Sequence, residues 1–235
     1  MAKRNAKESK DSKAGGDSGP WQGRRAARAG SEQRRRAILE ATLRIIVRDG
    51  IRAVRHRAVA KEAGVPLSAT TYYFKDIHDL IADAFTLFVE NALAQVIDPV
   101  WVEIYRYAGE HGGERLRDAA ARETFVHGLA KLSADFIERE VVVHREHLLA
   151  ERAFLQAAIL DERLREQAAV FQSRLRDGLT VFCRTVGTAD PALDAELIYD
   201  SFMQLEYECL VNNRFDRARA EQVMAHRLRL VLAGR

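Results

Sequence analysis

The fold is decided by residues 35–81, which read RRAILEATLRIIVRDGIRAVRHRAVAKEAGVPLSATTYYFKDIHDLI. Inward positions recur at helical spacing in the first part of this stretch, at Ile38, Ala41, Thr42, Ile45 and Ile46. We predict a first helix that begins near Ser31, as its N-cap, and ends at Asp49-Gly50.

Two shorter helices follow the first. One is predicted from Arg55 to Ala63, where Gly64 stops it, and the next runs from Ser68, as its N-cap, through Phe74. A helix, a tight turn that contains glycine and a second short helix together indicate a helix-turn-helix.

The remainder of the chain also reads as helices. Asp76 is predicted to cap a long amphipathic helix that extends to Ile97 and breaks at Asp98-Pro99. Further helices are predicted over residues 99–109, 114–140, 142–159, 161–186, 191–212 and 216–233. No segment shows sustained period-2 alternation, so the predicted fold class is all-α.

Charge is distributed unevenly along the chain. Residues 1–80 hold 18 Lys and Arg against 9 Asp and Glu, a net charge of +9, whereas the remainder carries −6. Residues 1–31, apart from Trp21, lack large apolar side chains that could anchor a fold, so we predict a disordered basic arm. A basic first part joined to an acidic second part indicates that the N-terminal part binds a polyanion such as DNA.

Residues 35–81 resemble the N-terminal domain of TetR-family regulators. The landmarks are the Ile38-Leu39 and Ala41 positions, Gly50, Val59-Ala60, Ala63-Gly64-Val65, Tyr73-Phe74-Lys75-Asp76 and Leu80. The resemblance implies a helix-turn-helix domain over residues 32–76, behind the arm of residues 1–31. It also implies a helical effector-binding and dimerisation domain over residues 77–235, which matches the family in length and helical content but not in motif.

Function follows from the resemblance as an expectation. The chain is expected to be a homodimeric, sequence-specific transcriptional repressor in the cytoplasm, released from a palindromic operator in double-stranded DNA by a small effector. Neither an enzymatic activity nor a cofactor is expected. The arm is expected to add phosphate contacts.

The predicted DNA-contacting residues lie on and around the two short helices: Arg55, His56, Arg57, Ser68, Ala69, Thr71, Tyr72, Tyr73 and Lys75. In the third helix Thr70 and Phe74 can point inward, which turns the other side chains outward. Arginine suits guanine O6 and N7, whereas small hydroxyl and methyl groups suit other base edges.

The sequence departs from the family pattern at three places. Ile77 stands where a phosphate-contacting Lys is common, Thr71 where Tyr is usual, and Arg55-His56 where Thr-Thr or Thr-Val is common. The usual contacts of the family are therefore not expected to hold unchanged.

The acidic second part supplies candidates for dimerisation and effector binding. By the resemblance, residues 161–186 and 191–212 pair across a two-fold axis. The predicted pocket residues are mostly aromatic: Trp101, Tyr105, Phe125, Phe136, His147, Phe154, Tyr199 and Met203. Aromatic side chains with a few polar groups favour a bulky, largely apolar effector, although aromatics at helical spacing are also typical of plain core.

One polar constellation raises the alternative of a metal site. Glu140, His144, His147 and Glu151 share one face if a single helix spans them, and such groups suit a transition metal. Interleaved arginines favour a solvated face instead, so no metal is predicted. The two cysteines, Cys183 and Cys209, have no metal-site spacing and are expected to be reduced and buried.

Other functions stay open from the sequence alone. A TetR-like activator or an architectural DNA-binding protein without an effector would show the same motif. A helical enzyme or binding module with an unrelated basic tail is a further alternative, but no nucleophile–base set or Gly-rich phosphate loop supports it. No uninterrupted apolar stretch is long enough for a membrane span, and no membrane partner is expected.

Overall fold

The computed structural model describes Gln22 and residues 29–233, and this part contains helices and no strand, as the predicted all-α class requires. The α-helices are α1 (Ala29–Asp49), α2 (His56–Ala63), α3 (Leu67–Tyr73), α4 (Ile77–Ala92), α5 (Asp98–His111), α6 (Ala119–Val142), α7 (Arg145–Ala158), α8 (Glu162–Val186), α9 (Pro191–Asn212) and α10 (Arg217–Ala233). Shorter helical turns are η1 (Ile51–Ala53), η2 (Leu93–Ile97) and η3 (Gly113–Arg117). Most of the predicted arm, including Trp21, lies outside the described residues.

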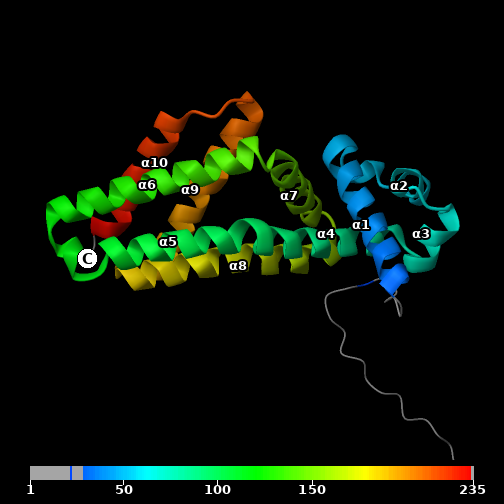
Figure 1. Cartoon of the computed structure of the whole chain (residues 1–235), viewed down its shortest axis with the longest axis horizontal. Coiled ribbons are helices and arrows are strands. Elements are labelled where there is room, and N and C mark those ends of the chain that lie inside the picture. Colours follow the sequence, from blue (N-terminus) through cyan, green and yellow to red (C-terminus); the bar gives the residue numbers. More distant parts are fainter. Residues whose placement is uncertain (1–21, 23–28, 234–235) are drawn as a thin grey trace, which may run out of the picture.

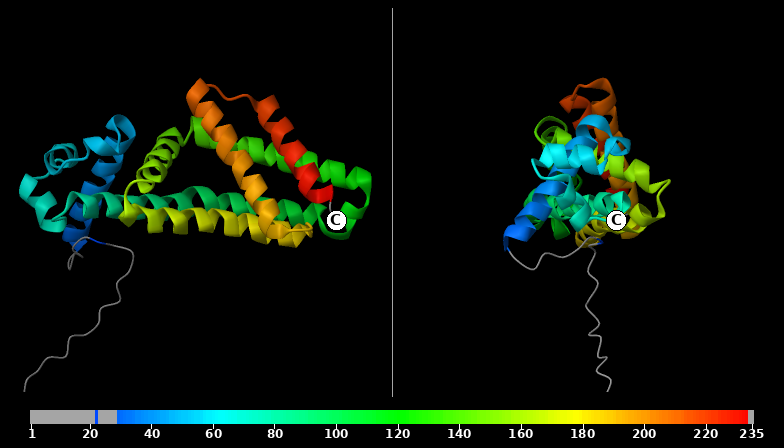
Figure 2. Two further views of the ribbon diagram at one scale, coloured as in Figure 1. Left: turned by 180° about the vertical axis from the view of Figure 1, so that it is seen from behind. Right: turned by 90° about the vertical axis from the view of Figure 1, so that its right-hand side faces the viewer.

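The helices form an elongated body with two ends. Figure 1 shows α1, α2 and α3 together at one end, and the view from behind in Figure 2 agrees. Helices α4 and α5 run along the body beside α8, while α6, α9 and α10 form the other end. Helix α7 lies between the two ends and packs on α1, α4, α6 and α8. The helix-turn-helix thus sits at one extremity of a larger helical body.

Two apolar cores hold these ends. The first joins α1–α4 to residues of α7 and α8, and its centre is an aromatic stack in which the Phe85 and Phe154 rings lie 4.5 Å apart. The second joins α5, α6, α8, α9 and α10, with Phe125 and Met224 fully buried in it. The core of the helix-turn-helix therefore continues past residue 76 into α4, α7 and α8, so the two ends are packed together.

The predicted break at Asp98-Pro99 is wrong. Helices α4, η2 and α5 run on as one 35-residue helix from Ile77 to His111. The reason is the π-helical turn η2, in which the Asp98 N–H donates to the Leu93 carbonyl, five residues back. Pro99 has no N–H, and its ring would clash with a carbonyl of the preceding turn; the wider π turn accommodates it.

This continuous helix is long and apolar enough, by length and composition alone, to cross a membrane. However, 56% of its most apolar window is buried inside the structure, and it packs against α1, α7 and α8. The core helix of a soluble protein passes the same test, and we assign the helix to the core.

Two predicted N-caps are also wrong. Helix α1 begins at Ala29, before Ser31, and the Ser31 hydroxyl bonds to a tyrosine instead. Helix α3 begins at Leu67, with Pro66 as its N-cap, because proline's fixed φ suits the entry to a helix. The predicted cap at Asp76 is confirmed, since its carboxylate accepts from the His78 N–H at 2.9 Å.

Candidate functional site

The turn between α2 and α3 has the geometry that the sequence predicts. Gly64 adopts the left-handed conformation (φ 65°), and its N–H donates to the Ala60 and Lys61 carbonyls, which ends α2. Only glycine takes this conformation without strain. Thr70 and Phe74 are fully buried, so the inward face of α3 is as predicted.

The outward face of the two short helices is polar and basic. Ser68, Thr71 and Tyr72 of α3 are exposed, Tyr72 by 52%. Arg57 of α2 and Lys75 after α3 are exposed as well. Together these five side chains form one accessible surface, which we call the α2–α3 face.

Three other residues predicted to contact DNA are less accessible. The Arg55 guanidinium folds back and donates to the Arg52 and Val54 carbonyls, at 2.7 and 2.8 Å. His56 and Ala69 are half-buried. These groups lie at the edge of the α2–α3 face.

The prediction that Tyr73 belongs beside the outward face is wrong. Its side chain is buried, with 5% exposure, and its hydroxyl lies 2.7 Å from the Ser31 hydroxyl of α1. The ring also lies edge-on to Tyr72, with centroids 5.2 Å apart. Tyr73 therefore fastens α3 to α1.

A buried ion pair supports the same region from behind. The Arg35 guanidinium of α1 donates to Asp83 of α4 at 2.5 Å and lies over the Phe74 ring, 5.4 Å from its centroid. Asp83 is fully buried and also accepts from the Gln22 N–H. Ile77, which stands where Lys is common in the family that the sequence resembles, packs half-buried against this core. The helix-turn-helix is thus tied directly to α4.

A cavity lies in the other half of the molecule, enclosed by α5, η2, α6, α7, α8 and α9. Of the eight predicted pocket residues, five line it: Trp101, Phe136, His147, Tyr199 and Met203. About 90 Å³ of it is open to the centre of a water molecule, where about 10–15 Å³ suffices for one water. The cavity therefore has room for a small molecule as it stands, but a bulky one requires the helices to separate.

The other three predicted pocket residues do not line this cavity. Phe125 is fully buried and stacks on Tyr107, and Phe154 is fully buried between Phe85 and Phe88. Tyr105 packs beside Trp101, with its hydroxyl donating to the Gly178 carbonyl at 3.3 Å. Phe125 and Phe154 are core, the alternative that helical spacing of aromatics left open, whereas Tyr105 is half-buried at the edge of the second core.

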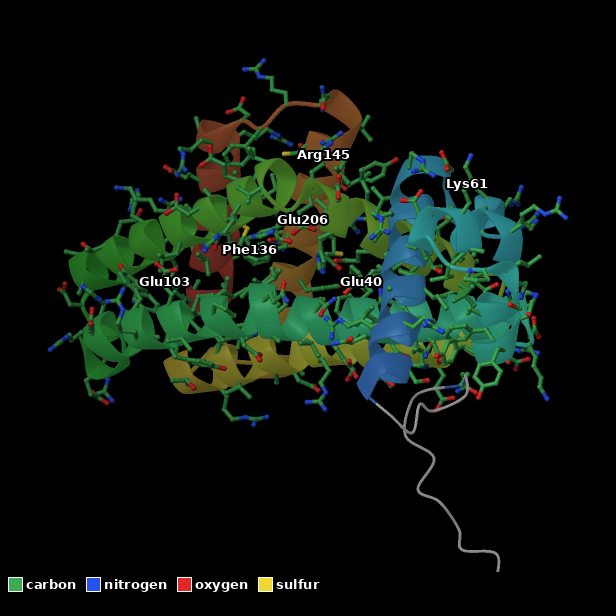
Figure 3. The ribbon with its side chains drawn as sticks, turned by 45° about the vertical axis from the view of Figure 1, so that its right-hand side comes forward. Glu40, Lys61, Glu103, Phe136, Arg145 and Glu206 are labelled. Carbon is green, nitrogen blue, oxygen red and sulfur yellow. The ribbon has the colours of Figure 1, made fainter. Side chains whose placement is uncertain are left out.

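Three buried carboxylates also line the cavity. Glu140 of α6, Glu151 of α7 and Glu206 of α9 are 4%, 8% and 3% exposed. Figure 3 shows Glu206 and Phe136 inside the bundle, whereas Lys61 lies on the surface of the helix-turn-helix end. Arg152 donates to Glu206 at 2.9 Å. Burial raises the pKa of Glu140 to about 7, with the neighbouring Glu151 charge as the second cause.

The sequence analysis grouped Glu140, His147 and Glu151 on the assumption that one helix carries all three, and the structure shows that this assumption is wrong. Helix α6 ends at Val142 and α7 begins at Arg145, so no single helix carries Glu140, His147 and Glu151. The turn between the helices nevertheless brings all three to the cavity. In the described part of the chain, no group of three or more His, Cys, Asp or Glu is placed to hold a metal ion. Glu206 was missed, because nothing near it in sequence marks it.

His147 belongs to the apolar wall of the cavity. Its ring stacks on Phe88 with centroids 4.4 Å apart, and neither ring nitrogen has a hydrogen-bond partner within the described structure. Burial lowers the pKa of His147 to about 4, so the ring is neutral near pH 7. His147 touches the Phe88 ring of α4 on one side and the cavity on the other.

Helices α8 and α9 pack on each other and still expose apolar side chains. The most exposed are Val170, Val181, Leu193, Leu197, Tyr207 and Val211. Cys183 and Cys209 are buried free thiols, as expected. These side chains are candidates for an interaction surface on the two helices.

Comparison with known proteins points to one family. Residues 38–84 match the family of bacterial regulatory proteins described as the tetR family. The HTH-type transcriptional regulator PksA of Bacillus subtilis (strain 168) is 39% identical over 67 residues, which are 28% of this chain and 33% of PksA. The matched stretch thus spans about a third of that relative's length.

Solved structures resemble the chain over most of its length. A transcriptional regulator from Rhodococcus sp. Rha1 superposes with a TM-score of 0.65 at 18% identity, covering 85% of this chain and 96% of the other. The multidrug binding protein EbrR, complexed with ethidium, gives a TM-score of 0.57 at 23% identity, covering 83% and 98%. At such identities the likeness concerns the fold alone.

Proposed function

We propose, from the match of residues 38–84 to the tetR family of regulatory proteins, that this chain is a TetR-type transcriptional regulator that represses transcription as a homodimer on a palindromic operator. A small, largely apolar effector releases it. The observation that carries this proposal is the continuous helix from Ile77 to His111. Its first half is part of the helix-turn-helix core, and its second half lines the cavity. The proposed domains are residues 1–31, 32–76 and 77–235, and the proposed compartment is the cytoplasm.

On DNA, the α2–α3 face enters the major groove. Arg57 suits a guanine as a bidentate donor, and the Ser68 and Thr71 hydroxyls suit other base edges. Tyr72 and Lys75 contact phosphates. Arg55, His56 and Ala69 reach the DNA from the edge of the face, and Tyr73 supports it from inside.

The dimer forms through α8 and α9. Their exposed apolar side chains supply the surface, and an isologous pairing buries them on both subunits. Two-fold symmetry then presents two α3 helices to successive major grooves, about 34–36 Å apart. A palindromic operator follows from that symmetry.

Release by the effector works through the continuous helix. A bulky ligand enlarges the cavity, whose wall includes Val96, Ile97 and Trp101 around the π turn. Because π turns are strained relative to α-helix, the helix yields there first. A shift of α4 then displaces Arg35 and Phe74, on which α3 rests. EbrR, which has this fold, was solved with ethidium bound, which supports a ligand-binding role for this half.

A mobility-shift titration with the DNA that flanks the chain's own gene tests the proposal. Specific binding, weakened by Arg57→Ala and by scrambling one half-site, is the expected result. Binding of equal strength to random DNA would contradict sequence-specific regulation. Sedimentation of the free protein tests the dimer separately, and Leu197→Glu in α9 is expected to shift it to the monomer.

A further inference from the structure

We propose that the cavity binds a lipophilic organic cation, and that Glu140 and Glu151 provide its negative charge. This inference rests on the proposed function and names the class of effector. The evidence for it is that one of the three buried carboxylates at the cavity forms an ion pair, whereas the other two do not.

The cavity contains more carboxylates than cations. Glu140, Glu151 and Glu206 come from three different helices, yet all three line the same space. Arg152 pairs with Glu206 at 2.9 Å, and no other ion pair involving these carboxylates occurs in the described part of the chain. Glu140 and Glu151 therefore form no ion pair of their own in this part of the chain, and the positive charges of Arg139 and Arg152 act on them only from a greater distance.

Burial of these two carboxylates without a partner is unfavourable in free energy. The Oε1 atoms of Glu140 and Glu151 are buried and have no hydrogen-bond partner among the described residues. A buried unpaired carboxylate loses its hydration without compensation, so it takes up a proton unless a positive charge arrives. Burial accordingly raises the pKa of both groups. A ligand cation can replace that proton.

The remaining wall suits the organic part of such a cation. Trp101, Phe136 and Phe202 line the cavity, and aromatic faces attract cations. Tyr199 also lines it, with the Arg176 guanidinium over its ring at 5.7 Å from the centroid. The helices α5 and α8 contribute apolar side chains to it, such as Ile104 and Leu175. An anion would meet the carboxylates at close range, and a neutral hydrocarbon would leave them unpaired. A positively charged group with an apolar body satisfies both parts of the wall.

The charged neighbours of Glu140 determine how pH acts on binding. Helix α7 brings Glu151, His147 and Arg152 to this region, and His144, just before that helix, acts on His147. Arg139 lies beside Glu140 on α6, and α9 brings Tyr199 and Glu206, the partner of Arg152. The pKa of His147 is lowered to about 4, and that of Tyr199 is raised to about 12, so neither ionises between pH 5.5 and 8. Proton loss from the carboxylates dominates in this range.

Calorimetry on the full chain with matched probes tests the inference. The probes are phenyltrimethylammonium, its neutral isostere tert-butylbenzene, and the larger cations tetraphenylphosphonium and ethidium. We expect at least one cation to bind and tert-butylbenzene to bind at least tenfold more weakly than phenyltrimethylammonium. If one proton with a pKa of about 7 is displaced, cation affinity rises about thirtyfold from pH 5.5 to pH 8.

Isosteric variants locate the charge. Glu140→Gln and Glu151→Gln are each expected to weaken cation binding at pH 8 about tenfold or more and, for Glu140→Gln, to flatten its pH dependence. Glu146→Gln on the exposed side of α7 is the control and is expected to change neither. Failure of all three cations to bind, equal binding of the neutral isostere, or unchanged affinity in both variants would overturn the inference.

The same preparations separate this inference from the proposed function. Mobility shifts without any ligand report operator binding alone. A protein that binds its operator but no cation overturns the cation assignment and leaves the repressor intact. A protein that binds the cation but no DNA overturns the repressor and leaves the cavity assignment standing.

Discussion

The two halves of the helix from Ile77 to His111 lie near buried carboxylates that differ in one respect: the one near the first half is paired with a cation, and two of those near the second half are not. Near its start, Asp83 is fully buried and paired with Arg35 at 2.5 Å. Near its end, the cavity holds Glu140 and Glu151 with unpaired oxygens. A buried charge with a partner fixes two helices to each other, whereas a buried charge without one makes a site for a ligand. The difference separates the scaffold of the DNA-binding end from the chemistry of the cavity.

Breaking the paired charge has the largest expected effect. Asp83→Leu removes the buried carboxylate from the Arg35 guanidinium, which is 5% exposed and keeps the more distant, exposed Glu32 at 3.8 Å. Removal of one partner of a buried pair costs about 3–5 kcal/mol. Urea unfolding at pH 7 is expected to show this loss in the free energy of unfolding. Glu40→Leu, which breaks the exposed Arg36–Glu40 pair, is expected to change it by less than about 1 kcal/mol.

The double variant Arg35→Leu/Asp83→Leu sharpens this test. If the penalty arises from the uncompensated charge, the second substitution restores much of the stability that the first removes. Additive losses in the double variant would show instead that shape, and not charge, holds α1 on α4.

Removing an unpaired buried charge is expected to stabilise the folded protein, whereas removing a paired one destabilises it. The pKa of Glu140 is about 7 in the folded chain and 4.5 as the ordinary value, so ionisation weakens the folded state as pH rises from 4.5 to 7. Above pH 7 the full cost is present, at most about 3 kcal/mol. Glu140→Gln is therefore expected to raise the free energy of unfolding at pH 8 and to leave it nearly unchanged at pH 4.5. An equal difference at both pH values would contradict the pKa shift.

The DNA-binding end could be predicted because its signals are local. Gly64 stops α2 by its own backbone conformation, and the spacing of Thr70 and Phe74 sets the inward face of α3. Tyr73 was misplaced because its partner, Ser31, lies in another helix 42 residues away. Local periodicity finds which residues share a face, but it does not tell which distant side chain covers that face.

The cavity could be predicted only in part. Aromatic content found Trp101 and Phe136, but the same rule selected Phe154, which is core. Glu206 carries no local signal, because its role depends on Arg152 and on two other helices. The continuity through Pro99 was also hidden, since a π turn depends on packing around it. Sites assembled from several helices depend on tertiary contacts.

Removing an exposed charge at the DNA-binding end is expected to affect affinity and not stability. Arg57→Ala should weaken operator binding by about 1–3 kcal/mol, the value of one bidentate arginine–guanine contact. Thermal unfolding is expected to stay unchanged, because Arg57 is exposed. Arg106→Ala, exposed on α5, is the control. A similar loss of affinity in both variants would show that Arg57 contributes only general charge.

The adjacent tyrosines give the smallest effects and the finest test of the same contrast. Tyr73→Phe removes the hydroxyl that lies 2.7 Å from Ser31 and is expected to lower the free energy of unfolding by about 1 kcal/mol. Ser31→Ala should cost a similar amount, and the double variant less than the sum, because both remove one hydrogen bond. Tyr72→Phe, at a 52% exposed site, should lower stability less than Tyr73→Phe does and weaken operator binding instead. If Tyr73→Phe weakened DNA binding with no loss of stability, Tyr73 would belong to the DNA interface, and the α2–α3 face would include it.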